Sequence, residues 1–331
     1  MIPITHIPIT QVAKGIARLG PLETGHRSGP TSPYIVFGKE LAMIAEPGQD
    51  GQAPQIIEAL KQCDISLDKV AYVWASHIHM YHVQGLSVLM AGLPKAKFLV
   101  HPRGAPHLVD VVRLMETTKP IWSIETTPQE KGTKCYGAMQ PIPADRVQPV
   151  EDNQVFDLGE KKVQIIWAPG HAPHHMGLFD LETRALFTGD TAMMGIPGRP
   201  RGHHDIRPPL FHVDNFVQTL QRYRALRPSV LLTHGMYGQS YTAEDTLRYC
   251  EEDIRAIERI CREGMKQKRS FKQIVADVDE YVSKVGGRPT NVEQRPEFTS
   301  GGLFGLINYL HRADPDLALP SGATQNMQTA L

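Results

Sequence analysis

The sequence predicts an α/β fold that is followed by a helical segment. Between residues 34 and 232, short apolar runs alternate with stretches of helical periodicity. Several of these runs are followed within a few residues by a histidine or an aspartate. The last third of the chain carries amphipathic stripes, which are typical of packed helices. Together these observations favour a layered α/β arrangement with polar side chains gathered at one edge of a sheet.

Composition indicates a soluble globular protein. The chain has 331 residues, of which 41% are hydrophobic and 21% charged. Lys and Arg together number 35, as do Asp and Glu, so no electrostatic footprint for nucleic acid or an anionic membrane is predicted. Pro3 and Pro8 interrupt the N-terminal stretch, and no apolar window is long enough to span a bilayer. We therefore expect a cytoplasmic protein.

The four cysteines are expected to be structural. They are Cys63, Cys135, Cys250 and Cys261, and none lies in a Cys-x-x-Cys pair. Neither a zinc knuckle nor a redox motif is therefore indicated. Three of them fall in apolar helical stripes, which favours small buried hydrophobic roles.

The first half of the chain predicts a hairpin and then alternating helices and strands. Strands are expected at 34–37 and 41–45, joined by a short turn. Further strands are expected at 70–75 and 97–100, and short helices near residues 56–63 and 85–90. Leu108, Val112 and Met115 have the spacing of one helical face. The segment 117–152 has little periodicity and is expected to be an insertion or a cap loop that could wall a pocket.

The second half predicts more strands and then helices only. Strands are expected at 163–167, 177–180, 185–187 and 230–232, with a helix marked by Phe216, Leu220 and Tyr223. A loop rich in Pro, Gly, Arg and His covers residues 193–212. Three apolar stripes then follow, beginning at Leu247, Phe271 and Leu303. We expect a catalytic domain at 1–241, a helical extension at 242–314 and a disordered tail at 315–331.

One stretch concentrates metal-ligand chemistry. His77, His79 and His82 lie within six residues, directly after the strand predicted at 70–75. Side chains alternate along a strand, so His77 and His79 point to the same side. Neutral imidazole is the commonest metal ligand in proteins. A surface loop that happens to be rich in histidine is the alternative interpretation.

Three later strand ends favour the metal site. His171 follows the strand at 163–167, Asp190 follows 185–187 and His234 follows 230–232. Strand ends at one edge of a sheet lie close together in layered α/β folds. Histidines placed at random would not be expected to recur at this position.

These residues and their order resemble the metallo-β-lactamase superfamily. That family has His-x-His-x-Asp-His, then Gly-His, then an Asp after Gly, then a late His. Here the corresponding stretches are 77–82, Pro169-Gly170-His171, Thr188-Gly189-Asp190 and Thr233-His234-Gly235. The match covers residues 34–235, and the combined pattern is highly specific. The resemblance implies a four-layer αββα sandwich.

The resemblance also implies a set of ligands. By position, His77, His79 and His171 would hold a first metal, and His82 and His234 a second, with Asp190 bridging the two. Zinc is the expected ion, one or two per chain, and iron or manganese also suit these donors. Such a metal supplies hydroxide at neutral pH, which would attack a carbonyl or phosphoryl centre. Asp190 and Tyr81 are the candidate catalytic residues.

Tyr81 departs from the family pattern, which has an Asp at this position. Phenol has a reference pKa near 10, so it is a poor ligand unless the metal ionises it. Three interpretations are open: a one-metal enzyme with a weak or empty second site, a phenolate ligand at the second site, or a protein that has lost activity and binds metal as a scaffold.

Other candidates surround this pattern. His175 is expected to orient a ligand from just outside the site, and His174 could equally face solvent. Arg residues in the 193–212 loop could recognise an anionic substrate. These and other candidate pocket residues are Arg199, Arg201, His203, His204, Arg207, Tyr237 and Tyr241. The histidines without a place in the pattern, expected to be structural or exposed, are His6, His26, His101, His107, His212 and His311.

The predicted function is metal-dependent hydrolysis of a small ester, thioester or lactone. Phosphodiester hydrolysis is the alternative within the same fold, and a catalytically impaired metal-binding scaffold is the alternative of another class. Neutral charge disfavours RNA processing. His79, where the flavin-linked di-iron branch has an acidic ligand, disfavours that oxidoreductase. We expect a small-molecule substrate, for which an anionic group is one option, and no nucleic-acid or membrane partner. A homodimer is compatible with the helical extension.

Overall fold

A computed structural model describes most of the chain. The described residues are 6–22, 31–117, 139–192, 206, 210–234, 242–285 and 303–323. No helix within these ranges is long and apolar enough to cross a membrane.

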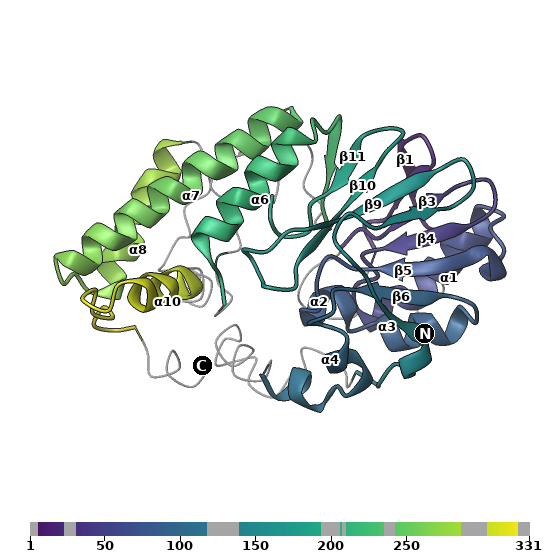
Figure 1. Cartoon of the computed structure of the whole chain (residues 1–331), viewed down its shortest axis with the longest axis horizontal. Coiled ribbons are helices and arrows are strands. Elements are labelled where there is room, and N and C mark those ends of the chain that lie inside the picture. The colour runs from purple at the N-terminus through teal and green to yellow at the C-terminus, as the bar shows by residue number, and fades with distance from the viewer. Residues whose placement is uncertain are drawn as a thin grey trace.

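Two sheets form the centre of the fold (Figure 1). The first is seven-stranded, in the order β1-β2-β3-β4-β5-β6-β7. The second is five-stranded, in the order β12-β11-β10-β9-β8. The first sheet comprises β1 (Ile9–Ala13), β2 (Ile16–Leu19), β3 (Tyr34–Phe37), β4 (Ala42–Ala45), β5 (Val70–Trp74), β6 (Lys97–Val100) and β7 (Val147–Pro149). The second comprises β8 (Val155–Asp157), β9 (Lys162–Trp167), β10 (Met176–Asp180), β11 (Ala185–Phe187) and β12 (Val230–Leu232).

Helices cover the outer face of each sheet. The first sheet is covered by α1 (Ala53–Gln62), α3 (Leu86–Gly92) and α4 (Pro106–Val109), and α2 (Met80–Val83) precedes α3. The second sheet is covered by α6 (Val213–Ala225), α7 (Ala243–Lys266) packs on α6, and α8 (Phe271–Lys284) and α10 (Phe304–Ala313) pack on α7. Figure 1 shows α6 and α7 on one side of the sheets and α1 and α3 on the other. The result is the predicted αββα sandwich, with further helices at its C-terminal end.

Alternation along the strands assigns side chains to separate cores. On β3, Ile35 packs under the helices of the first sheet, whereas Tyr34 and Val36 pack between the two sheets. Trp74 at the end of β5 is fully buried in the layer between the sheets. A third apolar cluster joins the second sheet to α6, α7, α8 and α10. Successive side chains on opposite faces are what a strand buried on both sides requires.

Three expectations need correction. Leu108 is buried, but Val112 is 60% exposed, so the predicted single helical face through both is wrong. Asp110 is extended at the end of α4, and its side chain accepts from the Val112 amide, so the helix is interrupted there. The predicted loop at 117–152 contains β7, and β1, β2 and β8 were also not expected. These are short strands that include polar residues, so their apolar signal is weak.

Part of the predicted tail is packed. Leu317 is buried, and the Phe271 amide donates to the Ser321 carbonyl. Residues 324–331 lie outside the described ranges, as do residues 118–138 of the predicted cap loop.

Candidate metal centre

The predicted ligands meet at one edge of the two sheets. His77 and His79 follow β5, and His82 lies on α2 directly after them. His171 lies in the loop between β9 and β10, Asp190 follows β11 and His234 follows β12. Apart from the half-buried His79, all of these side chains are buried. Residues far apart in the sequence are therefore brought to one place by strand order.

Three imidazoles form the first ligand group, His77, His79 and His171. The His79 Nδ1 lies 2.8 Å from the His77 Nε2 and 3.1 Å from the His171 Nε2. The Ser76 hydroxyl lies 3.0 Å from the His77 Nδ1, which leaves Nε2 of that ring for the site. Burial, together with His82 and the neighbouring imidazoles, holds the pKa of His77 well below its usual value. A neutral ring is the form that binds zinc, because it presents a lone pair.

Asp190 lies between the two halves of the site. Its Oδ2 is 3.6 Å from the His77 Nε2 and 3.4 Å from both the His171 and His82 Nε2 atoms. Burial opposes ionisation of this carboxyl, but His82 above all holds the pKa of Asp190 well below its usual range. The carboxylate can therefore face either ligand group while ionised.

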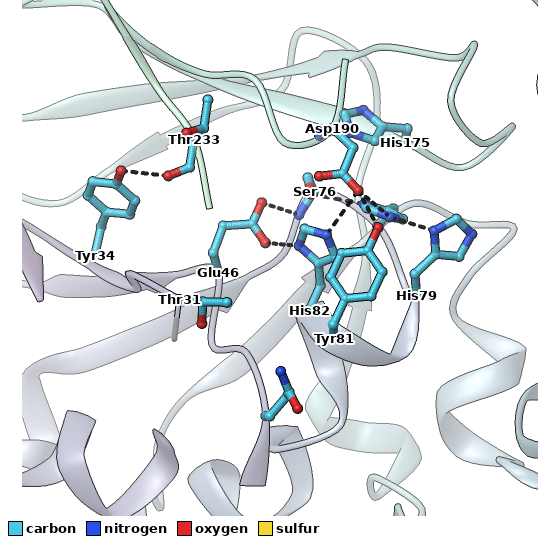
Figure 2. A network of polar contacts seen from close by, with 12 residues as sticks. Thr31, Tyr34, Glu46, Ser76, His79, Tyr81, His82, His175, Asp190 and Thr233 are labelled. Atoms are coloured by element: carbon cyan, nitrogen blue, oxygen red, sulfur yellow. Dashed lines mark hydrogen bonds and ion pairs between the residues drawn. The ribbon is translucent and has the colours of Figure 1, made fainter. Parts of the chain in front are cut away.

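Tyr81 lies inside the site. Its hydroxyl donates to the Asp190 Oδ2 at 2.5 Å, and its ring stacks on His234 with a centroid separation of 5.6 Å. Figure 2 shows the phenol aimed at the Asp190 carboxylate. The family has an aspartate at this position, which accepts hydrogen bonds. This chain has a tyrosine there, whose hydroxyl donates to Asp190.

Glu46 is a site residue that the sequence interpretation missed. This buried carboxylate follows β4; its Oε2 lies 2.6 Å from the His82 Nδ1, and its Oε1 accepts from the Ser76 amide at 3.2 Å (Figure 2). Glu46, His82 and His234 form a second group of closely spaced ligand atoms. Glu46 has a backbone φ of +57°, which is unusual for a residue other than glycine. An acidic residue directly after an apolar strand was the signal available in the sequence.

Glu46 and Asp190 together set the charge on His82. Burial opposes a charged ring, but these two carboxylates raise the pKa of His82 to about 10. His234 behaves in the opposite way, because burial and the charge on His82 lower its pKa to about 4. In the metal-free protein, a cationic His82 thus lies between two anions and beside a neutral His234.

We expect Glu46→Gln to lower the pKa of His82 and to destabilise the metal-free protein by about 2 kcal/mol, because a charge-assisted hydrogen bond is lost in a buried position. Histidine NMR titration and urea unfolding measure the two effects. Glu160→Gln is the matched control, since Glu160 forms an exposed ion pair with Lys39 and should change stability by less than about 0.5 kcal/mol. An unchanged His82 titration would contradict the assignment.

His175 lies where the sequence placed it, just outside the ligand groups. Its Nε2 accepts from the Asp190 amide at 3.1 Å, which orients the loop that carries this aspartate. Gly189 is required beside it, since a Cβ there would lie 2.5 Å from the His175 Nε2 and the Ser76 Cβ. His174, by contrast, is half-buried, and burial with the imidazoles around it holds its pKa well below the usual value.

The start of α6 supports the loop that carries His171. The His212 amide donates to the Gly170 carbonyl at 2.9 Å, and the Thr219 hydroxyl donates to the Pro169 carbonyl at 2.8 Å. Gly170 has a φ of +144°, and a Cβ there would lie 2.4 Å from the Phe216 Cα. The helix backbone and the ligand loop are therefore in direct contact.

Gly170→Ala should destabilise the protein by about 3 kcal/mol, because it combines backbone strain with a clash against the main chain of α6. Urea unfolding measures the change. Gly322→Ala separates the two causes, since Gly322 also has positive φ, +81°, but open space around it. A cost there of about 1 kcal/mol is expected from strain alone; equal costs at both positions would show that the contact with α6 is unimportant.

Several predicted pocket residues lie outside the described ranges. These are Arg199, Arg201, His203, His204, Arg207, Tyr237 and Tyr241. His101, expected to be structural or exposed, is buried, and its ring lies 4.6 Å from that of Trp167.

Comparisons with known proteins agree with this fold. The chain is 29% identical over 207 residues to a metallo-beta-lactamase fold-containing protein from Sulfurisphaera tokodaii, covering 61% of this chain and 71% of that one. It is 30% identical over 207 residues to an atrochrysone carboxyl ACP thioesterase from Aspergillus fumigatus, covering 60% and 56%. A metallo-beta-lactamase family protein from Thermus thermophilus has the same fold, with a TM-score of 0.62 at 15% identity over 92% of this chain and 95% of that one.

The family model of the metallo-beta-lactamase superfamily matches residues 26–235, which include all the predicted ligands. The chain therefore belongs to the metallo-beta-lactamase superfamily.

Proposed function

We propose that this protein hydrolyses a small ester or thioester with one zinc ion held by His77, His79 and His171. The observation that carries the proposal is the convergence of these three imidazoles beside the Asp190 carboxylate. Three neutral imidazoles with one open position are the usual donor set of catalytic zinc. When bound, zinc polarises a carbonyl oxygen and supplies hydroxide at neutral pH. Iron and manganese fit the same donors, so metal identity is part of the test.

Ser76 and His175 orient two residues of the proposed metal site. Ser76 contacts the His77 Nδ1 and so directs Nε2 of that ring into the group. His175 holds the backbone of Asp190. Partners of this kind fix ligand orientation and commonly change metal affinity about 10- to 100-fold when removed.

Asp190 is the proposed proton acceptor. Its Oδ2 faces the ring nitrogens of His77 and His171, and its lowered pKa keeps it ionised at neutral pH. A carboxylate there can accept a proton from an attacking water and orient it toward the substrate carbonyl. The Tyr81 hydroxyl, bonded to the same oxygen, fixes the direction of that carboxylate.

Tyr81 supports the one-metal form. The second ligand group contains His82 and His234, but the Tyr81 hydroxyl donates a hydrogen bond to Asp190 at the position where the family has a carboxylate. Glu46 contacts the His82 Nδ1, on the opposite side of the ring from the Nε2 that faces Asp190. It therefore orients His82 and does not replace the missing ligand.

One of the similar proteins also supports a thioester or ester as the substrate. It is named as an acyl carrier protein thioesterase, and a carbonyl centre suits a site of this kind.

The experiment combines metal analysis with turnover. The purified chain, loaded separately with zinc, manganese and iron, is analysed for metal per chain and assayed on acetyl thioester, phenyl ester and lactone substrates. We expect one tightly bound metal per chain and thioester or ester hydrolysis. His79→Ala should reduce metal content and lower kcat/KM by at least about 1000-fold, whereas His6→Ala, at an exposed position before β1, should change neither. A protein that binds no divalent metal, or turnover that survives His79→Ala, would contradict the proposal.

A further inference from the structure

Two buried ring nitrogens beside the first ligand group have no partner within the described part of the chain. These are the Trp167 Nε1 and the His174 Nε2. Buried polar side-chain atoms in folded proteins almost always form hydrogen bonds, and an unpaired one costs about 1–3 kcal/mol. One of these atoms is on the loop that carries His171, and the other is at the end of the strand before it, so we infer that a ligand satisfies them.

The fold places the His174 ring next to the metal ligands and Trp167 at the end of the strand that leads into the same loop. Trp167 ends β9 and pairs with Met176 at the start of β10, so the loop between them, residues 168–175, carries both His171 and His174. The His174 ring centroid lies 5.9 Å from that of His79 and 6.1 Å from that of His77. Its nearest ligands are thus those of the first group.

His101 extends this surface from the other sheet. It follows β6, the strand paired with β5, which leads to His77. Its ring lies 4.6 Å from Trp167, and its Nδ1 accepts from the Arg103 amide at 3.1 Å, which keeps the proton on Nε2. We call the surface formed by His101, Trp167 and His174 the ring wall.

Tyr81 borders both ligand groups. Its ring stacks on His234, and its centroid lies 6.2 Å from that of His77 and 6.3 Å from that of His79. The His174 ring contacts are with the same two residues, His77 and His79. The His174 end of the ring wall and Tyr81 therefore both lie beside the first group.

The main chain holds Trp167 rigidly. Its amide donates to the Asp152 carboxylate at 2.7 Å, and its carbonyl accepts from Arg222 at 3.0 Å. Arg222 also donates to the Asp152 carboxylate at 2.9 Å, so the two residues that bond the Trp167 backbone are bonded to each other. A backbone fixed in this way suits recognition, because little backbone entropy is lost on binding.

We propose that Trp167 and His174 determine substrate specificity by binding a second oxygen acceptor on the acyl group, beyond the carbonyl that is attacked. Indole Nε1–H only donates, so the ligand atom at Trp167 must be an acceptor. The ring surfaces of His101 and Trp167 favour a planar group such as a ketone or a conjugated carbonyl. This inference rests on the proposed acyl hydrolysis and adds to it the kind of acyl group that is preferred.

The test compares acyl groups that differ by one oxygen. Pentanoyl, 3-oxopentanoyl and 4-oxopentanoyl thioesters of N-acetylcysteamine are assayed with the zinc-loaded full-length protein. We expect at least one oxo substrate to be preferred about tenfold in kcat/KM, mainly through KM, as one good hydrogen bond allows. Trp167→Phe and His174→Phe should each reduce this preference to within about twofold.

Two further variants separate recognition from folding. His174→Gln keeps a donor and should retain part of the preference, whereas His6→Phe makes the same change as His174→Phe at an exposed position and should retain all of it. Circular dichroism confirms that each variant is folded. A wild-type protein without preference for either oxo substrate, or a preference that survives both ring substitutions, would overturn the inference.

A binding measurement keeps the inference independent of turnover. Calorimetry with the zinc-loaded protein compares 4-oxopentanoate with pentanoate, whose carboxylates are alike. We expect tighter binding of the oxo acid and loss of the difference in His174→Phe. If no thioester is hydrolysed but this difference in affinity is found, the proposed reaction is wrong and the proposed binding role of the ring wall is retained. Equal affinities for the two acids would overturn that binding role.

Discussion

Tyr81→Asp is expected to raise the metal content from one to two ions per chain. The substitution exchanges a hydroxyl with a reference pKa near 10 for a carboxyl with one near 4, which is ionised at neutral pH. It also removes the hydroxyl that now donates to the Asp190 Oδ2 at 2.5 Å. The Asp190 carboxylate is then free to bind a metal ion in each of the two ligand groups. With His82 and His234 already in place, we expect the second dissociation constant to fall about 100-fold, about 2.7 kcal/mol.

Metal analysis by mass spectrometry and competition with a fluorescent chelator measure this change. Tyr81→Phe is the matched control, because it removes the hydroxyl and supplies no ligand; we expect it to leave one metal per chain. Two tightly bound metals in the unmodified protein would show that the present site is already complete. No change in either variant would show that residue 81 does not influence the second group.

The layered fold could be predicted from the sequence because its signals are local. Apolar runs such as 70–74 and 162–167 identify buried strands, and the stripe through Leu247, Ile254 and Cys261 identifies α7. The short strands β1, β2, β7 and β8 carry no such signal. They form because neighbouring strands supply backbone partners, which is information that a short window does not contain.

The convergence of the candidate ligands could be predicted because they recur at strand ends. Glu46 occupies the same kind of position and was missed, since an acidic residue before Pro47-Gly48 also suits an ordinary turn. Its role depends on the approach of His82 to 2.6 Å, which no spacing in the sequence reveals. The roles of His174 and Trp167 were invisible for the same reason, because the lack of a partner is a property of the folded surroundings.

Acid should unfold the metal-free protein far above the pH at which its carboxylates titrate. Burial and neighbouring groups lower the pKa values of His77, His175 and His234 in the folded state, whereas histidine in the unfolded chain titrates near 6.5. Below about pH 6.5 these histidines therefore bind protons in the unfolded chain but not in the folded chain. The free energy of unfolding falls by about 1.4 kcal/mol per pH unit for each such residue. His234, with its pKa near 4, alone accounts for about 3 kcal/mol between pH 6.5 and 4.

His82 makes the stability of the protein depend on pH in the opposite direction. Its pKa is raised to about 10, so its contribution is complete below about pH 6.5 and is lost as the pH rises from there toward 10. Asp190 and Glu46 have lowered pKa values, so they contribute above their ordinary values, near 4, and lose that contribution only in stronger acid. The two histidine effects together predict greatest stability of the metal-free protein near pH 6.5.

Urea unfolding in the presence of a chelator, from about pH 4.5 to 9, measures this curve. His234→Gln should make the acid side less steep by about one proton, because a group that resists protonation is gone. His6→Gln, at an exposed position, is the control and should leave the slope unchanged. Zinc should stabilise the protein most at about pH 7 to 8 and lose its effect in acid, because protons compete for the same imidazole lone pairs. A metal-free protein equally stable at about pH 6.5 and 4.5 would show that these histidines are not held neutral by the fold.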